Sequence, residues 1–288
     1  MPAPINGARA YEYLKQITDL GPRPAGSVAN ALQRQLVALQ FAQNGGIVRA
    51  QPFSGIDPLN GARVEMANLV GSWFPERTER VLLAAHYDTR PLADQELDPA
   101  GRKTPYLGAN DGASGVAMLM EIANHLKSLP TNVGVDLVLF DGEELVYDER
   151  GEYFLGSKEF VRVYNEGLQQ GTSLGRYKAA LVLDMVGGKN LQLTKEPYSL
   201  NLAPQLVQEV WNVARRLRAP AFSNRVGRAV MDDHLPLNYG GIPAIDLIDF
   251  DYPYWHKAQD VPQNISPASF RQVGRVVTAW LTQRLPVR

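Results

Sequence analysis

The chain has 288 residues, of which 45% are hydrophobic and 20% are charged, and its formal net charge at pH 7 is −1. This composition is ordinary for a soluble globular protein and excludes a disordered or collagen-like chain. The near-zero net charge gives no electrostatic basis for binding nucleic acid or an anionic membrane surface. The sequence contains no cysteine, which excludes disulfides, thiolate zinc sites and cysteine nucleophiles together.

The N-terminal segment, MPAPINGARAYEYLKQ, lacks the apolar core of a signal peptide, and no apolar run is long enough to span a bilayer. We therefore expect no membrane partner, and we also expect a monomer. A signal peptide removed ahead of residue 1 would leave the same chain, so the compartment stays open and a secreted or periplasmic location remains an alternative.

Strand-like apolar runs alternate with amphipathic helical patterns along the chain. In chain order, the spacing of apolar residues predicts a helix at 31–44, a strand at 80–86, a helix at 112–129, strands at 135–140 and 179–183, a helix at 203–218, a strand at 242–248 and a helix at 267–284. Strands separated by helices favour an α/β fold with a largely parallel sheet that is covered on both faces. The sequence shows no internal repeat, low-complexity tract or linker, so we expect residues 1–288 to form a single domain.

Three longer irregular stretches, at 89–109, 144–156 and 249–260, begin at or just after the end of a predicted strand. In open α/β sheets, ligands bind at the edge where the carboxyl ends of the strands lie. The polar residues that could act in catalysis or metal binding lie at the same strand ends. The sequence therefore predicts a functional site at this edge of the sheet.

Two candidate ligands lie at the end of the first predicted strand and just before the following helix. His86 and Asp88 form an H-x-D pair whose side chains point to the same side of an extended segment. A carboxylate beside an imidazole commonly fixes the tautomer of a metal-binding histidine. Asp111, in GANDGASG, is either a metal ligand or an N-terminal helix cap.

Further carboxylates follow the next two strands. Glu143 and Glu144 come directly after VLFDG, and neighbouring side chains in an extended segment point in different directions. One of them can therefore bind a cation while the other faces the substrate as a base. The alternative for this pair is a solvated acidic turn. Asp184, after AALVL, is either a strand-end turn residue or a member of the site.

We expect different roles for the four histidines of the sequence. His86 and His256 are candidate ligands, and His256 lies in a loop rich in aromatic residues. His125 is expected on the polar surface of its helix, whereas His234, after Asp232 and Asp233, is expected to form structural hydrogen bonds.

Taken together, the candidates at one sheet edge form a set of nitrogen and oxygen ligands that suits zinc: His86, Asp111, Glu144, Asp184 and His256. Glu143 is the candidate general base beside this set. The sequence has no G-x-S-x-G elbow, and GANDGASG lacks the lysine of a P-loop, so serine hydrolase and nucleotide-binding functions are disfavoured.

At these residues, the sequence resembles the M28 zinc aminopeptidases and the glutaminyl cyclases that share their fold. The resemblance runs from about Leu20 to the final helix and rests on the ordered segments AAHYDTRPLAD, LGANDGASGVAMLMEIA, LVLFDGEE, YFLGSKEF, LVLDMVGG, DDHLPLNYGGIPAIDLID and YWH. It implies a zinc-exopeptidase-like fold, which is a three-layer α-β-α sandwich around a mixed, mostly parallel sheet.

The two branches of this superfamily imply different metal contents. In the aminopeptidases, two zinc ions share the residue that matches Asp111; the positions of His86 and Asp184 complete one site, and those of Glu144 and His256 complete the other. In the glutaminyl cyclases, one zinc ion is held at the positions of Asp111, Glu144 and His256. These enzymes convert N-terminal glutamine of peptides or proteins into pyroglutamate and release ammonia.

Three features favour the cyclase branch, in its bacterial form. Asp232 precedes Asp-His, Trp255 precedes the last ligand, and LVLDMVGGKN resembles bacterial cyclases. Two features depart from the pattern: Lys257 stands where the family usually has threonine, and DGEE is closer to animal cyclases. The alternatives are a di-zinc aminopeptidase and, in another class, a binding domain without catalysis.

The cyclase branch also implies roles for the residues around the ligands. Glu143 would be the general base, in a carboxyl network with Asp184 and Asp232. Trp255, with Tyr252 or Tyr254, would form the wall of a small pocket that holds the substrate in a cyclising geometry.

Overall fold

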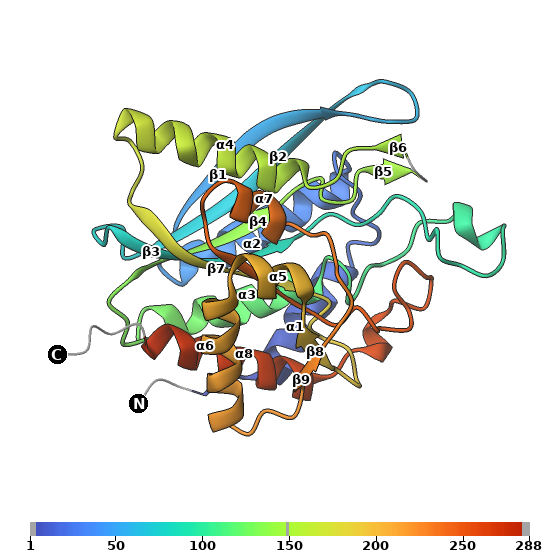
Figure 1. Ribbon diagram of the computed structural model, residues 1–288. Coiled ribbons are helices and arrows are strands. Elements are labelled where there is room, and N and C mark those ends of the chain that lie inside the picture. Colours follow the sequence, from blue (N-terminus) through green and yellow to red (C-terminus); the bar gives the residue numbers. More distant parts are fainter. Residues whose placement is uncertain (1–3, 148–149, 284–288) are drawn as a thin grey trace.

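Four strands of the central sheet correspond to the apolar runs that the sequence predicts. They are β3 (Glu79–His86), β4 (Gly134–Phe140), β7 (Arg176–Asp184) and β10 (Ala244–Ile248), and they are buried along most of their length. These strands run parallel in the spatial order β4-β3-β7-β10, so their carboxyl ends meet at one edge. Figure 1 shows the computed structural model, which describes residues 4–147 and 150–283.

The sheet continues beyond β4 with two strands that the sequence pattern did not predict. Strands β2 (Arg63–Trp73) and β1 (Ile47–Ile56) extend it to six strands, and β2 runs antiparallel to both β4 and β1. Strand β1 lies at the edge and is largely exposed, so it lacks the apolar run of a buried strand. The sheet is therefore mixed and mostly parallel.

Helices cover both faces of this sheet and complete the three-layer sandwich. The larger core lies under helices α1 (Gly7–Thr18), α2 (Val28–Gln43), α3 (Ser114–Leu126), α6 (Pro204–Arg216) and α8 (Pro267–Gln283). The smaller core lies on the opposite face, under α4 (Leu155–Gln170) and α7 (His234–Tyr239). The fold class expected from the sequence is confirmed.

Short elements connect these layers. They are α5 (Pro197–Leu202), the 3-10 helices η1 (Gly101–Lys103) and η2 (Pro262–Asn264), and the two-stranded pairs β5 (Val146–Tyr147) with β6 (Arg150–Gly151) and β8 (Leu193–Lys195) with β9 (Phe222–Val226). Of the longer helices, α1 and α4 were not predicted. The last residue of the helix predicted at 267–284 lies outside the described residues. Within those residues, no helix has both the length and the apolar character needed to cross a bilayer.

The expectation that His125 lies on the surface is wrong. Helix α1 packs against α3 and covers its polar side, which leaves the residue 3% exposed. His125 Nε2 lies 2.8 Å from the Glu121 carboxylate, which also accepts a 2.6 Å hydrogen bond from Arg9 on α1. The polar residues of α3 therefore attach the first helix to the core.

Candidate metal centre

Histidine and carboxylate side chains surround a cavity of about 680 Å³ at the carboxyl ends of the parallel strands. His86 ends β3, Glu143 and Glu144 follow β4, and Asp184 ends β7. Loops supply the remaining carboxylate, guanidinium and imidazole groups that line the cavity, which are Arg90, Asp94, Asp111, Asp232 and His256. The edge predicted from the sequence thus gathers the predicted residues.

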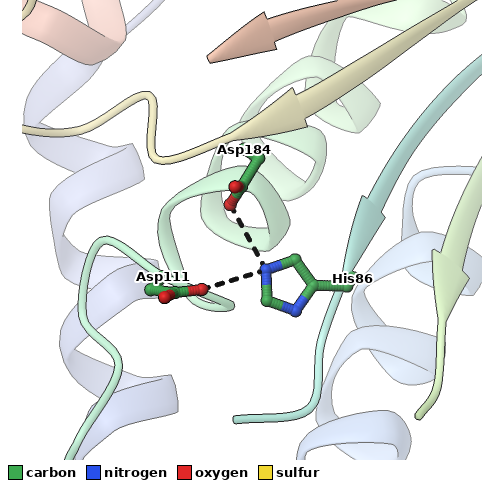
Figure 2. Close-up of side chains that lie close together, drawn as sticks. All are labelled: His86, Asp111 and Asp184. Carbon is green, nitrogen blue, oxygen red and sulfur yellow. Dashed lines mark hydrogen bonds and ion pairs between the residues drawn. The ribbon is translucent and has the colours of Figure 1, made fainter. Parts of the chain in front are cut away.

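Asp111 lies between the two candidate histidine ligands. Its Oδ1 is 3.2 Å from His86 Nε2, and its Oδ2 is 3.4 Å from His256 Nε2. On the side of His86, Asp184 Oδ1 also lies 3.2 Å from the same nitrogen, as Figure 2 shows. On the other side, Glu144 Oε1 lies 2.7 Å from His256 Nε2. Asp111 therefore occupies the position of a residue that two cation sites could share.

Among the buried groups of three residues that have the donor atoms and spacing of a metal site, two contain Asp111, and a third combines His86 with Glu143 and Glu144. In the first group, which is Asp111, Glu144 and His256, one ligand atom from each residue lies within 4.8 Å of the others. The second group, which is His86, Asp111 and Asp184, meets the same criterion. Imidazole nitrogen and carboxylate oxygen are ligands that zinc accepts, so both groups fit this ion.

The orientation of His256 depends on a residue that the sequence did not single out. Its Nδ1 lies 2.8 Å from Asp94 Oδ1, and Arg90 Nε donates a 2.8 Å hydrogen bond to the other oxygen of that carboxylate. A carboxylate on the second ring nitrogen fixes a histidine ligand and raises its basicity. Lys257, in the place of the usual threonine, donates instead to the Pro253 carbonyl. Asp94 rather than residue 257 therefore supports His256 through its second ring nitrogen.

The Asp88 carboxylate forms hydrogen bonds with the backbone of Glu143 and Glu144 and not with the ring of His86. Its two carboxylate oxygens accept the backbone N–H groups of Glu143 and Glu144, at 3.0 Å each. The distance from Asp88 Oδ1 to His86 Nδ1 is 3.9 Å, which is too long for a hydrogen bond. Glu144 Oε2 also accepts the Arg90 N–H at 2.8 Å. These contacts direct Glu144 toward His256 and leave Glu143 facing the cavity.

Crowded carboxyl groups in this cavity favour protonation. Burial, reinforced by the charge of Glu144, raises the pKa of Glu143 well above its usual range. Burial also raises the pKa of Asp184 to about 7, with further contributions from Asp111 and Asp232 against the opposing effect of His86. A carboxyl group with a pKa of about 7, as at Asp184, can exchange protons near neutral pH.

The aromatic wall of the cavity differs from the expected one. Trp255 lines the cavity and stacks on His256, with ring centroids 4.0 Å apart. Tyr252 and Tyr254 lie outside its lining and border a separate hollow of about 360 Å³. The remaining aromatic side chains that line the candidate site are Tyr153, Phe154, Tyr198 and Phe250. The expectation that Tyr252 or Tyr254 forms part of the wall does not match these positions.

Three residues in or next to the candidate site have a left-handed backbone although they are not glycines. The φ angles are 64° at Phe154, 47° at Met185 and 53° at His256. This region is costly for residues with a Cβ atom and occurs often at functional sites.

The expectation that His234 forms structural hydrogen bonds is wrong, because in the described part of the chain neither ring nitrogen has a partner with hydrogen-bond geometry. The side chain is fully buried, and its Nε2 lies 3.3 Å from Glu196 Oε2. Beside it, the buried carboxylates of Asp232 and Asp246 lie close enough to form a further group of potential ligands with His234. Asp246 was not singled out from the sequence, because it lies within an apolar strand.

Comparisons with known proteins show the family of this chain. The model of peptidase family M28 matches residues 68–281, and the chain belongs to this family. Among solved structures, it is similar to the glutaminyl cyclase of Fimbriiglobus ruber, with 40% identity, coverage of 98% of this chain and 96% of that chain, and a TM-score of 0.94. The chain is therefore an enzyme of the M28 family with glutaminyl cyclases among its relatives, as the resemblance implied.

Two further relatives represent the two branches. The mouse glutaminyl-peptide cyclotransferase-like protein is 25% identical over 91% of this chain and 72% of that protein. A leucine aminopeptidase precursor from Bacteroides thetaiotaomicron is 31% identical, with 98% of each chain covered and a TM-score of 0.90. Because cyclases and aminopeptidases share this fold, only the residues of the site can indicate which of the two activities the chain has.

Proposed function

We propose that this chain is a zinc-dependent glutaminyl-peptide cyclotransferase, which converts N-terminal glutamine of peptides or proteins into pyroglutamate and releases ammonia. The observation that carries the proposal is the wall of three carboxyl groups, Glu143, Asp184 and Asp232, beside the group of Asp111, Glu144 and His256. The similarity to the Fimbriiglobus ruber cyclase over nearly both full chains supports it.

One zinc ion would be held by Asp111, Glu144 and His256. When bound there, zinc supplies Lewis-acid polarisation of the glutamine side-chain carbonyl and stabilises negative charge on its oxygen. The protein contributes the orientation of the ligands, through Asp94 at His256 and the Arg90 N–H at Glu144.

Glu143 would move the proton that the reaction requires. The α-amino nitrogen of the substrate forms a bond to the side-chain carbonyl carbon, and the bond from that carbon to the amide nitrogen breaks. Glu143 accepts a proton from the attacking amine and delivers it to the leaving nitrogen, which departs as ammonia. The raised pKa of Glu143, which burial and the charge of Glu144 produce, suits a group that holds the proton between these two transfers.

Asp184, Asp232 and Trp255 would complete the site. The two aspartates line the same cavity as Glu143, so their carboxyl groups can share protons with it and hold the substrate amine. Trp255 stacks on His256 and would form the apolar wall that keeps the substrate folded for ring closure.

A di-zinc aminopeptidase is the second candidate, because His86, Asp111 and Asp184 also meet the spacing of a metal site. Incubation with a glutamine-initiated and a leucine-initiated peptide, followed by mass spectrometry, separates the two functions. Loss of ammonia without cleavage is the expected result, and release of free leucine would overturn the proposal. Metal analysis should give about one zinc ion per chain rather than about two.

A further inference from the structure

Three consecutive backbone N–H groups in the segment that carries Asp111 donate to a single residue, Asp260. The Ala109 N–H donates to the Asp260 carbonyl oxygen at 3.2 Å. The N–H groups of Asn110 and Asp111 donate to the two oxygens of the Asp260 carboxylate, at 2.8 and 3.0 Å. The Asp260 side chain is fully buried, so these hydrogen bonds do not compete with water.

Asp260 also belongs to the turn that carries His256. Its N–H donates to the Lys257 carbonyl at 2.9 Å, and the Lys257 N–H donates to the Tyr254 carbonyl at 3.1 Å. The Tyr252 hydroxyl donates a 2.9 Å hydrogen bond to the Asp260 carboxylate. This contact gives Tyr252 a role in supporting the turn rather than in lining the substrate cavity.

The segment that carries Asp111 is held from its other side as well. The buried guanidinium of Arg23 donates to the carbonyl oxygens of Leu107 and Gly108, at 2.8 and 3.0 Å. The segment ends at Gly112, whose φ of 87° and whose approach to the Asp88 carbonyl leave no room for a Cβ atom. Arg23 thus binds the carbonyl groups and Asp260 binds the N–H groups of one short, tightly bent loop.

We propose that Asp260, supported by Tyr252, is a positioning residue for the metal centre, which fixes Asp111 relative to His256. Asp111 and Asp260 are 149 residues apart in the sequence, and the carboxylate of Asp260 joins the two loops that carry these ligands. Metal ligands need partners that hold their geometry, and such partners commonly control affinity. This inference rests on the proposed zinc site but is independent of the reaction that the site catalyses.

The test compares zinc affinity in variants of the full-length protein. In Asp260→Asn, an amide N–H replaces one acceptor oxygen and opposes a backbone N–H. Zinc affinity, measured by competition with a chromophoric chelator, should fall by about 10- to 100-fold. Tyr252→Phe removes one donor and keeps both backbone contacts, so its loss should be smaller. Tyr254→Phe, at the ring that packs edge-on against Tyr252, should match the parent.

Cobalt substitution gives a readout that a general loss of stability would not change. Ligand geometry determines the visible absorption of bound Co²⁺, so Asp260→Asn and Tyr252→Phe should shift its bands. Asp136→Asn provides the matched control, because it alters a buried, hydrogen-bonded aspartate on β4 far from the cavity. It should lower the melting temperature and leave both the spectrum and the zinc affinity unchanged.

Unchanged zinc affinity and an unchanged cobalt spectrum in Asp260→Asn would overturn the inference, as would an equal effect of Asp136→Asn on both. If Asp260→Asn does not fold, identical zinc affinities in Tyr252→Phe and Tyr254→Phe would overturn it. A parent protein that binds zinc but does not cyclise glutamine would refute the proposed reaction and leave this inference standing. A parent that binds no zinc would refute both.

Discussion

The two ends of the parallel strands bury charged groups in opposite ways. At the amino end, Arg80 and Asp136 form an ion pair with hydrogen bonds of 2.8 and 2.7 Å, and each side chain is 1% exposed. The Tyr177 hydroxyl adds a third hydrogen bond to Asp136 at 2.7 Å. The neighbouring hollow at this end, of about 760 Å³, has no histidine in its lining.

At the carboxyl end, buried carboxylates are numerous and cations are few. Among the described residues, oxygen atoms of three buried aspartates have no hydrogen-bond partner: Asp232, Asp233 and Asp246. Buried polar atoms without a partner destabilise a fold, so their concentration beside the candidate metal centre is typical of a functional site. The amino end shows how the same sheet stabilises charge where no chemistry is required.

The largest effect should follow from altering the base at the carboxyl end. In Glu143→Gln, the side chain can no longer accept a proton, and turnover should fall by about 100-fold or more. Zinc should remain bound, because Glu143 is not in the group of Asp111, Glu144 and His256. Kinetics with a glutamine-initiated peptide and zinc analysis on the same sample check this. Persistent activity would show that another group moves the proton.

A change at the amino end should affect stability alone. Asp136→Asn leaves the buried Arg80 without its ionic partner, so the free energy of unfolding should fall by about 3 kcal/mol. Urea denaturation measures this loss. Zinc affinity and turnover should match the parent, and a loss of either would show that the two ends are coupled.

A smaller effect is expected from the carboxylate that orients His256. Asp94→Asn should weaken zinc binding by about 10-fold, because the amide oxygen can still accept from Nδ1 but carries no negative charge to raise the basicity of the imidazole. Glu96→Gln is the matched control on the same loop, since its Oε1 accepts the Ala258 N–H and a glutamine oxygen can do the same. Equal affinities of the two variants would contradict this role for Asp94.

The pH dependence of zinc binding should follow the protonation of His256. Burial lowers its pKa, but the charge of Glu144 and the hydrogen bond to Asp94 more than offset this and raise the pKa to about 9. Before zinc binds, the imidazole therefore carries a proton below about pH 9, and zinc has to displace it. Affinity should fall as the pH falls from 9 to 6. In Asp94→Asn, the decline in zinc affinity should begin at a lower pH. An unchanged pH profile of zinc affinity would show that Asp94 does not raise the pKa of His256.

The smallest effect concerns Glu121, a paired carboxylate away from both ends. Burial opposes its ionisation, but the hydrogen bonds from His125 and Arg9 outweigh this and lower its pKa. Its ionised form therefore stabilises the fold above the pKa of the unfolded chain, and this contribution is lost as the pH falls through the folded value. Glu121→Gln should reduce stability by about 1 to 2 kcal/mol at neutral pH. Urea denaturation at several pH values should show that the difference in the free energy of unfolding between Glu121→Gln and the parent becomes smaller in acid. A difference that does not change with pH would contradict this linkage.

The sequence could predict the buried strands and the site because both leave local patterns. The strands β3, β4, β7 and β10 are apolar runs, and His86, Glu144 and Asp184 stand at or just beyond their ends. Strand β1 was missed because an exposed edge strand lacks such a run. Asp94 and Arg90 lie in a loop without regular pattern, and only the folded chain brings them to His256.

Tertiary packing also determined the positions that the sequence placed wrongly. His125 has helical spacing typical of a solvated face, but α1 covers that face. Tyr252 lies in the aromatic loop beside the ligand, yet its hydroxyl points to Asp260. Helix α1 is distant in sequence from His125, and Asp260 is eight residues from Tyr252 in a loop without regular pattern, so local composition could not reveal either contact.

The left-handed backbones at Phe154, Met185 and His256 have a consequence for how the enzyme fails on heating. Each conformation costs on the order of 1 to 2 kcal/mol and persists only while the surrounding packing enforces it. The loops that contain these residues should relax before the central sheet melts, since local unfolding begins where the native state is least stable. Thermal inactivation should therefore precede the loss of secondary structure, and a sample that has lost its catalysis should still give the circular dichroism of a folded α/β protein.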